Sequence, residues 1–346
     1  MFNVRKLKEK AFVIAEIGQN HQGDLDMALE YIKIFAAAGA DAVKFQTRDN
    51  KFLFSEDAYN APYTSENSFD DVYGLHREKL ELKLEWYPLL IDSCKKYGVK
   101  FMCTPFDENS LDFLINSGVD ILKIASFDLG NLPFINRIAK AKIPTVISIG
   151  GGNSEQITSS VNTLLEHLNE DQISILHCVS EYPCDATKLG LDNIEKLIKD
   201  FEGITIGLSD HFNGILSGPL GFIKGARVFE KHVTLNRSLK GTDHSFALEP
   251  DGFRKFVRDI HRTPVMMKPK SSDEIGNEPV FKKLGKSLIV NRDLFAGEQL
   301  TLENLSGKIF REQYIPVRES NHVIGKKVNR DLNKGEKILY TDLQNL

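Results

Sequence analysis

The chain has 346 residues, a length that fits one large α/β barrel of about 250 residues together with a smaller module. Its 41% hydrophobic and 27% charged residues are typical of a soluble globular protein, and a net charge of -4 excludes a general attraction to nucleic acid or to an anionic membrane. Four cysteines without CxxC spacing predict reduced structural thiols. The N-terminal sequence shows no signal peptide or transmembrane span, so we expect a cytoplasmic location.

Along residues 1–262 one pattern repeats, in which a short β-branched or aromatic run is followed by a loop and an amphipathic helical segment. The runs begin at Ala11, Asp41, Val99, Ile121, Thr145, Ile173, Ile204 and Arg227. The helical segments between them include residues 26–39, 86–98, 109–118, 132–142, 155–168 and 191–201. Eight strands alternating with helices predict a (β/α)8 TIM barrel. A doubly wound sheet is the weaker alternative, because no GxGxxG follows the first strand.

A linker and a second module follow the barrel. Residues 263–283 are rich in proline, serine and charged residues, which is typical of a linker. Within residues 284–346, "RDLFAGEQLTLENL" from Arg292 recurs as "RDLNKGEKILYTDL" from Arg330. Two copies are too few for a solenoid, so the repeat predicts a small pseudo-symmetric β-rich domain.

Each predicted strand ends in polar residues. In a TIM barrel the chemistry lies at the carboxyl ends of the strands, so these residues should form one polar rim. They are Glu16, Lys44, Gln46, Thr104, Lys123, Ser126, Ser148, Ser180, Tyr182, Ser209, His211, Glu230, Lys231 and His232.

Two histidines on this rim are candidates for metal binding. His211 and His232 end the seventh and eighth strands, which are neighbours in the barrel. Two imidazoles at one mouth could hold a divalent metal and leave positions for water and substrate oxygens. The alternative is a pair of hydrogen-bonded core histidines, and two ligands do not separate manganese, iron and zinc.

Lysines and small hydroxyls form a second candidate cluster. Lysine ammonium groups suit phosphate or carboxylate, and small hydroxyls can donate to the remaining anionic oxygens. The pattern therefore predicts a pocket for a small dianion or trianion, although each hydroxyl alone could form a local backbone hydrogen bond. The members are Lys44, Lys123, Thr104, Ser126, Ser148 and Ser209.

Acidic groups are candidates for proton transfer. Glu16 could orient or deprotonate a water, with Asp210, Asp243 and Glu230 as competitors. For Glu230 and Lys231 we expect a salt-bridged pair, or outer support for His232.

A series of motifs resembles the sialic acid synthase family, the phosphoenolpyruvate-dependent synthases of nine-carbon 2-keto-3-deoxy sugar acids. The motifs are "IAEIGQNHQG", "AVKFQT", "CTPFD", "LKIASFDLGNLPFI", "GLSDH", "EKHVTL" and "GTDHSFALEPDGF". The segments "GEQLTLENL" and "NHVIGKKVNRDLNKGEKI" resemble that family's antifreeze-like (SAF, β-clip) domain. The match covers almost the whole chain in the family's order.

The resemblance implies roles for the rim residues. It places phosphoenolpyruvate on Lys44, Thr104, Lys123, Ser126, Ser148 and Ser209, with Ser180 standing where an asparagine is common. It places the sugar on Gln46, Asp128, Tyr182 and Asp243, and makes Glu16, Asp243 and Lys123 the catalytic candidates. Through His211 and His232 it implies a divalent metal, with Mn²⁺ expected and Mg²⁺ or Co²⁺ as alternatives.

The chain also departs from the family. "SIGGG" replaces the frequent STGM of the fifth strand, and "KIFREQYIPVRES" replaces an Arg-Pro-Gly-x-Gly motif whose arginine reaches the partner subunit's sugar site. Arg311 is our candidate for that arginine, Arg318 is the reserve, and a domain-swapped homodimer is the implied assembly.

The implied reaction condenses phosphoenolpyruvate with an open-chain N-acylated amino hexose, such as N-acetylmannosamine or a 2,4-diacetamido-trideoxyhexose. Three alternatives remain: a 3-deoxy-octulosonate- or heptulosonate-type synthase, a metal-dependent barrel isomerase or aldolase that does not use phosphoenolpyruvate, and a non-catalytic sugar-binding protein. We expect residues 59–82, the long segment after the second strand, to shape the acceptor side.

Overall fold

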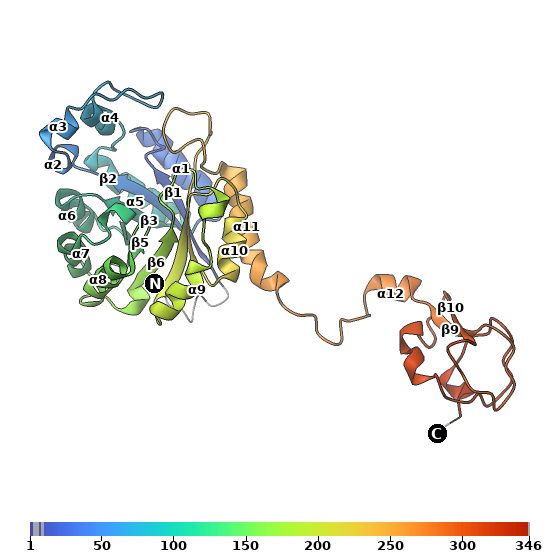
Figure 1. Cartoon of the computed structure of the whole chain (residues 1–346). Coiled ribbons are helices and arrows are strands. Elements are labelled where there is room, and N and C mark those ends of the chain that lie inside the picture. The colour runs from blue at the N-terminus through green and yellow to red at the C-terminus, as the bar shows by residue number, and fades with distance from the viewer. Residues whose placement is uncertain (3–6, 8–9, 345–346) are drawn as a thin grey trace. The chain divides into compact units, whose positions relative to one another are not determined.

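The computed structural model describes residues 1–2, 7 and 10–344, and the chain divides into two units, Met1–Met267 and Lys268–Leu346. Each unit has its own hydrophobic core. Figure 1 shows the strands and helices of the first unit in blue to orange and the second unit in orange to red. The two units are described separately below.

The first unit is a closed barrel of eight parallel strands, in which β1 pairs with β2 on one side and with β8 on the other. Each predicted run contains one strand, so the predicted barrel is confirmed. The strands are β1 Phe12–Gly18, β2 Ala42–Thr47, β3 Lys100–Pro105, β4 Ile121–Ile124, β5 Thr145–Ser148, β6 Ile173–Cys178, β7 Thr205–Asp210 and β8 Val228–His232.

Helices surround the barrel, and the six predicted helical segments are confirmed. Local signals begin and end several of them: Asp107 caps α6 through the amide of Ser110, and Gly118 ends it in the left-handed conformation that glycine adopts easily. The helices are α1 Leu25–Ala37, α5 Tyr87–Tyr97, α6 Glu108–Ser117, α7 Leu132–Lys140, α8 Ser154–Leu165, α9 Asn193–Asp200, α10 Ser217–Ile223 and α11 Pro250–Met266. The expected barrel boundary at residue 262 lies inside α11.

Residues 48–82 follow β2 and include the long segment 59–82. They form a packed substructure with three short helices, α2 Asn50–Leu53, α3 Glu56–Tyr59 and α4 Tyr73–Lys79. His76 lies among aromatic rings, with its centroid 4.6 Å from that of Tyr63. Gly74 lets α4 approach α3 closely, because a Cβ there would lie 2.3 Å from the ring of Tyr59. Contacts between its own aromatic residues and helices therefore hold this segment together.

The barrel interior changes from apolar to polar over two residues along each strand. The lower layer is apolar and contains Phe2, Ile14, Ala42, Met102, Ile121, Val146, Leu176 and Val228. Because strand side chains alternate with a period of two, the next inward layer lies two residues further on. That layer contains Glu16, Lys44, Thr104, Lys123, Ser148, Cys178, Ser209 and Glu230, all of them buried. The apolar layer closes one end of the barrel, and the polar layer faces the carboxyl ends of the strands.

The second unit is small and rich in turns. It contains α12 Pro279–Leu284 and an antiparallel pair, β9 Ser287–Val290 and β10 Leu305–Lys308. The sequence repeat appears as paired hydrogen bonds: the amide of Leu294 donates to the carbonyl of Leu332, and that of Leu332 donates to Leu294, each at 2.9 Å. Both leucines are buried in the core of this unit. The repeat thus builds a pseudo-two-fold core.

Two further expectations concern the chain as a whole. All four cysteines are buried and free, as expected for structural thiols. Within the described residues, no helix is long and apolar enough to cross a membrane.

Candidate active site

Lys44 lies at the centre of the buried polar layer. Its Nζ is 2.8 Å from Oε2 of Glu16 and 3.8 Å from Oε1 of Glu230, and it donates to Oγ1 of Thr104 at 3.2 Å. Burial opposes the charge on Lys44, but the two carboxylates outweigh it and raise the lysine's pKa. Lys44 therefore stays cationic inside the barrel.

Lys123 is a second buried cation, with less compensation. It is 3% exposed, and its Nζ donates to the carbonyl of Ile124 at 3.0 Å. Burial lowers its pKa, while the charge of Glu230 partly restores it. A buried ammonium with a single backbone acceptor is costly unless an anionic ligand completes its shell.

Several oxygen atoms beside these lysines lack partners. Oγ of Ser148 and Oε2 of Glu230 are buried and have no hydrogen-bond partner among the described residues. Ser209 donates to Oε1 of Glu230 at 3.2 Å. Unsatisfied buried groups are rare in folded proteins, so these atoms have hydrogen-bonding capacity that a bound ligand would use.

Ser126 and Ser180 lie at the edge of this layer and are more exposed than Ser148. Both border Gly150, where an added Cβ would be 2.3 Å from Oγ of Ser180 and 2.9 Å from Oγ of Ser126. The amide of Gly150 donates to Ser126 at 3.0 Å. Gly150, the first glycine of "SIGGG", therefore makes room for these two hydroxyls.

Glu16 has the environment of a proton carrier. Burial, opposed by Lys44, raises its pKa from 4.5 to about 7, and Gln46 donates to its Oε1 at 2.7 Å. At Gly18, with φ of +56°, an added Cβ would lie 3.1 Å from Glu16 Oε1, 3.3 Å from Gln46 Nε2 and 3.7 Å from Asp243 Oδ2. The structure thus brings three predicted residues around one glycine.

His211 and His232 form the predicted imidazole pair, with ring centroids 5.3 Å apart. Nδ1 of His211 donates to the carbonyl of Val179 at 2.7 Å, which leaves Nε2 with the lone pair in the neutral ring. Nδ1 of His232 is buried without a hydrogen-bond partner and lies 3.6 Å from Oδ2 of Asp243. Burial lowers the pKa of His232 to about 3, which keeps its imidazole neutral, as a metal ligand must be.

This donor set fits a divalent metal held by two imidazoles. In the part of the chain that the structure describes, no group of three or more histidine, cysteine, aspartate or glutamate side chains is arranged for a metal. Water and substrate oxygens would therefore fill the other positions, as in an open catalytic site.

Tyr182 and Asp128 lie on the outer part of the rim. The ring of Tyr182 is 4.0 Å from that of His211 and 5.8 Å from that of His232, and the residue is 46% exposed. Asp128 is partly buried and accepts a hydrogen bond from Asn131 at 3.0 Å. Tyr182 is therefore accessible to a ligand above the histidines, and Asp128 is partly exposed after β4.

The expected salt bridge between Glu230 and Lys231 is wrong. Adjacent strand residues point to opposite faces, so Glu230 faces the barrel interior while Lys231 points outward. Lys231 instead pairs with Asp210 at 2.7 Å and donates to the carbonyl of Phe212. Asp210 is therefore occupied outside the barrel and does not compete with Glu16 for a catalytic role.

In the second unit the two candidate arginines differ. Arg311 is exposed and makes no hydrogen bond or ion pair within the described residues. The guanidinium of Arg318 lies over the ring of Phe281, with Cζ 5.6 Å from the centroid. Arg311 therefore has the freer side chain.

Sequence reasoning missed a charged network beside Gln46. Arg48 donates to Oε1 of Gln46 at 2.6 Å and to Oε1 of Glu81 at 3.2 Å. Gln19 also donates to Oε1 of Glu81, at 3.0 Å. The only sequence signal was the position of Arg48, two residues beyond Gln46 on the same strand end.

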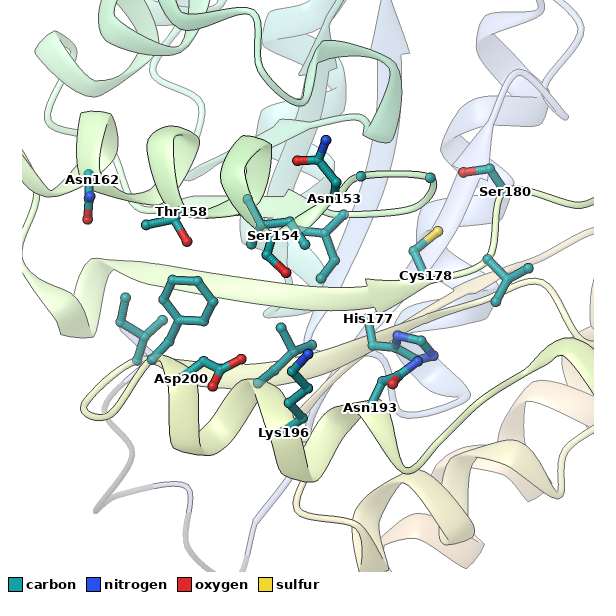
Figure 2. A pocket seen from close by; sticks show the side chains of 18 of the residues that line it. Asn153, Ser154, Thr158, Asn162, His177, Cys178, Ser180, Asn193, Lys196 and Asp200 are labelled. Carbon is teal, nitrogen blue, oxygen red and sulfur yellow. The ribbon is translucent and has the colours of Figure 1, made fainter.

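A cavity of about 950 Å³ lies outside the strands, between α8 and α9 over β6 (Figure 2). Of the predicted site residues it includes only Ser180. The cavity therefore lies mainly outside the barrel and meets the polar layer only at Cys178 and Ser180.

Known proteins resemble this chain over most of its length. The sequence model of the NeuB family matches residues 31–272. The N-acetylneuraminate-9-phosphate synthase of Drosophila melanogaster is 32% identical over 364 residues, covering 98% of this chain and 98% of that protein. The N,N'-diacetyllegionaminic acid synthase of Legionella pneumophila is 32% identical over 339 residues, covering 96% of this chain and 94% of that protein. The crystal structure of the N-acetylneuraminic acid synthetase of Leptospira borgpetersenii gives a TM-score of 0.68 at 30% identity, covering 77% of this chain and 90% of that one.

Proposed function

The chain belongs to the NeuB family and is an enzyme, and from this membership we propose that it condenses phosphoenolpyruvate with an open-chain N-acylated amino hexose. The products are a nine-carbon 2-keto-3-deoxy sugar acid and inorganic phosphate. The observation that carries this proposal is the buried layer inside the barrel, where two lysines and several unpaired polar atoms lie beside the imidazoles of His211 and His232.

Phosphoenolpyruvate matches the charge of this layer. Its carboxylate and phosphate would bind Lys44 and Lys123, and the hydroxyls of Thr104, Ser148 and Ser209 would donate to the remaining oxygens. Ser126 and Ser180, beside Gly150, are proposed to complete this site. Holding both anionic groups in one orientation supplies the positioning that such a reaction requires.

The acceptor sugar is proposed to lie above the histidines, against Gln46, Asp128, Tyr182 and Asp243. A divalent metal, for which we propose Mn²⁺, would be held by His211 and His232 and would supply Lewis-acid polarisation of the aldehyde. Tyr182, whose ring lies against His211, would pack on the sugar and exclude water.

The bond changes follow from this arrangement. C3 of phosphoenolpyruvate bonds to the aldehyde carbon, C2 becomes electron-poor, and water adds to C2. Glu16, whose pKa lies at about 7, can accept the proton of that water, with Asp243 orienting it. The proton that Glu16 accepts passes to the former aldehyde oxygen, which becomes a hydroxyl. The C2 hydroxyl then loses its proton to the departing phosphate as the bond between C2 and the phosphate oxygen breaks, which leaves the 2-keto group.

The second unit is proposed to be an antifreeze-like domain that closes the acceptor site of a partner subunit in a homodimer. Arg311 is the proposed contact, because its side chain has no partner within its own described chain.

A direct test uses the purified, metal-stripped full chain with phosphoenolpyruvate, Mn²⁺ and a panel of N-acylated amino hexoses. We expect inorganic phosphate release that requires both the metal and a particular sugar, with the nine-carbon product identified by mass spectrometry. Absence of release across the panel, together with absence of phosphoenolpyruvate binding by calorimetry, would contradict the proposal.

A further inference from the structure

The segment after β2 carries a positive charge that its surroundings leave unpaired. Arg77 lies on α4, and its Nε is buried without a hydrogen-bond partner. Within the described residues its guanidinium makes no hydrogen bond or ion pair. Arg77 is partly buried, and its Nε lacks an acceptor although a buried donor left without one costs free energy.

The position of Arg77 is well defined. Gly74 and His76 of α4 are buried, and Nδ1 of His76 accepts a hydrogen bond from the amide of Phe69 at 3.1 Å. Asn67, in the same segment, accepts from the amide of Gly241 at 3.0 Å. This bond ties the segment to the loop that carries Asp243. Arg77 is thus held at the rim and does not extend freely into solvent.

The neighbouring acids do not neutralise Arg77. Burial lowers the pKa of Arg77, and the charge of Arg48 lowers it further, while Glu81 and Asp243 act in the opposite direction. Both oxygens of Glu81 already accept from Arg48, Oε1 from the guanidinium and Oε2 from the amide, at 3.2 Å each. Arg48 therefore engages both oxygens of Glu81, and among the described residues neither Glu81 nor Asp243 makes an ion pair with Arg77.

We propose that Arg77 binds an oxyanion carried by the acceptor sugar at the end remote from its aldehyde, and so determines acceptor specificity. This inference rests on the proposed function. The two anionic groups of phosphoenolpyruvate have Lys44 and Lys123 inside the barrel, whereas Arg77 lies with Arg48 and Asp243 beside the acceptor residues. A guanidinium matches the paired oxygens of a phosphate monoester or a carboxylate, and such a group would supply the missing hydrogen bonds.

Three acceptors that differ only at C6 separate the possible oxyanions: N-acetylmannosamine, its 6-phosphate and the corresponding 6-carboxylate. For each, phosphate release from phosphoenolpyruvate gives kcat/KM for the wild type, Arg77→Gln, Arg77→Lys and the control Arg254→Gln. Arg254 is a suitable control because its side chain is 59% exposed on α11. Thermal unfolding checks that all four proteins are folded.

We expect the wild type to prefer one of the two charged acceptors. Arg77→Gln should lower kcat/KM for that acceptor by about 10- to 100-fold through KM, with little change for the neutral sugar or in the KM of phosphoenolpyruvate. Arg77→Lys should retain part of the preference, and Arg254→Gln all of it. A wild-type preference for the neutral sugar, equal losses on all three acceptors, or a raised KM for phosphoenolpyruvate would overturn the inference.

Binding separates this inference from the proposed reaction. Calorimetric titration of wild type and Arg77→Gln with the three sugars requires no turnover. If no acceptor supports phosphate release but the charged sugar binds the wild type more tightly than Arg77→Gln, the reaction is wrong and the oxyanion site stands. If turnover occurs while binding of the charged sugars is the same in both proteins, the reaction stands and the role of Arg77 is wrong.

Discussion

The barrel mouth and the C-terminal unit differ in how many of their polar side-chain atoms have a hydrogen-bond partner. Among the described residues, the buried side-chain atoms without a partner lie in the barrel unit, apart from Oε2 of Glu278 in the segment before β9. They include atoms of Ser148, Glu230, His232 and Arg77. The barrel thus leaves hydrogen-bonding capacity unused where a ligand is proposed to bind.

The C-terminal unit uses its polar groups on itself. Arg330 donates to Asp342 at 2.7 Å and to Glu336 at 2.8 Å, and the equivalent Arg292 of the other repeat donates to Glu298 at 3.2 Å. Such reciprocal pairing stabilises a small module that has only a modest core. The two regions thus differ in that several buried polar atoms of the barrel mouth lack a hydrogen-bond partner, whereas the arginines of the repeat are paired with carboxylates.

The largest effect should come from removing the imidazoles. His211→Ala and His232→Ala should each lower kcat by on the order of 10³-fold or more, because the aldehyde loses its polarising group. Mn²⁺ binding, measured by calorimetry, should weaken in parallel. His261→Ala, which changes an exposed histidine on α11, is the control. Near-normal turnover in either site variant would remove the metal from the proposal.

Removing the C-terminal unit tests whether the barrel alone binds phosphoenolpyruvate and whether turnover requires the C-terminal unit. A chain ending at Met267 should keep a folded barrel that binds phosphoenolpyruvate, because the first unit has its own core. Turnover should fall by about 10²-fold, since the acceptor site loses its closure. Steady-state kinetics and calorimetry on the truncated chain measure both. Full activity would contradict the capping role.

If the repeat contact stabilises the C-terminal unit, a substitution there should lower the free energy of unfolding of that unit. Leu332→Ala should lower the free energy of unfolding of the C-terminal unit by about 2–5 kcal/mol, because it empties part of the pseudo-two-fold core. Leu302→Ala, at a residue that is 75% exposed, should change it little. Urea unfolding of both variants provides the measurement. Equal stabilities would show that the repeat contact is unimportant.

Removing a buried cation should do the reverse, lowering activity while sparing stability. Lys123→Met should raise the KM for phosphoenolpyruvate by about 10²-fold, because one anionic group loses its ammonium. Stability should stay equal or rise by about 1 kcal/mol, since burial disfavours the charge. Lys96→Met, on the exposed face of α5, serves as the control. A large loss of stability would make Lys123 structural.

The last effect concerns pH. Glu16 has a pKa raised to about 7, so its contribution to stability is present below its ordinary value of 4.5 and is lost as pH rises through 7. Glu16→Gln, which mimics the protonated acid, should match the wild type at pH 4 and exceed it by about 3 kcal/mol at pH 8. Urea unfolding at both pH values, with the exposed Glu202→Gln as control, tests this. A pH-independent difference would exclude the raised pKa.

Much of the barrel could be predicted because its signals are local. Alternation along each strand and turn residues between elements identified all eight strands and six helices, and strand order followed from chain order in a parallel barrel. The same period brought Lys44, Lys123 and Ser148 to one mouth. The same two-residue alternation places the side chains of Glu230 and Lys231 on opposite faces of β8, so these sequence neighbours do not form a salt bridge.

The rest depended on contacts between distant segments. The helices of the segment after β2 are only four to seven residues long, too short to show a helical period, and an aromatic cluster holds them. The engagement of Glu81 with Arg48 joins residues that no motif connects. Nothing in the sequence around Arg77 indicates that its Nε is buried without a hydrogen-bond partner.

Periodicity and motif spacing, which are local properties of the chain, are enough to predict the barrel, the two-fold repeat and the lysines, hydroxyls and imidazoles at its mouth. The folded chain is needed to show which carboxylate faces which cation, how burial shifts the pKa of Glu16, and which polar atoms lack a partner. Those properties depend on distances and solvent exclusion between residues far apart in sequence, and they set the chemistry of the barrel mouth.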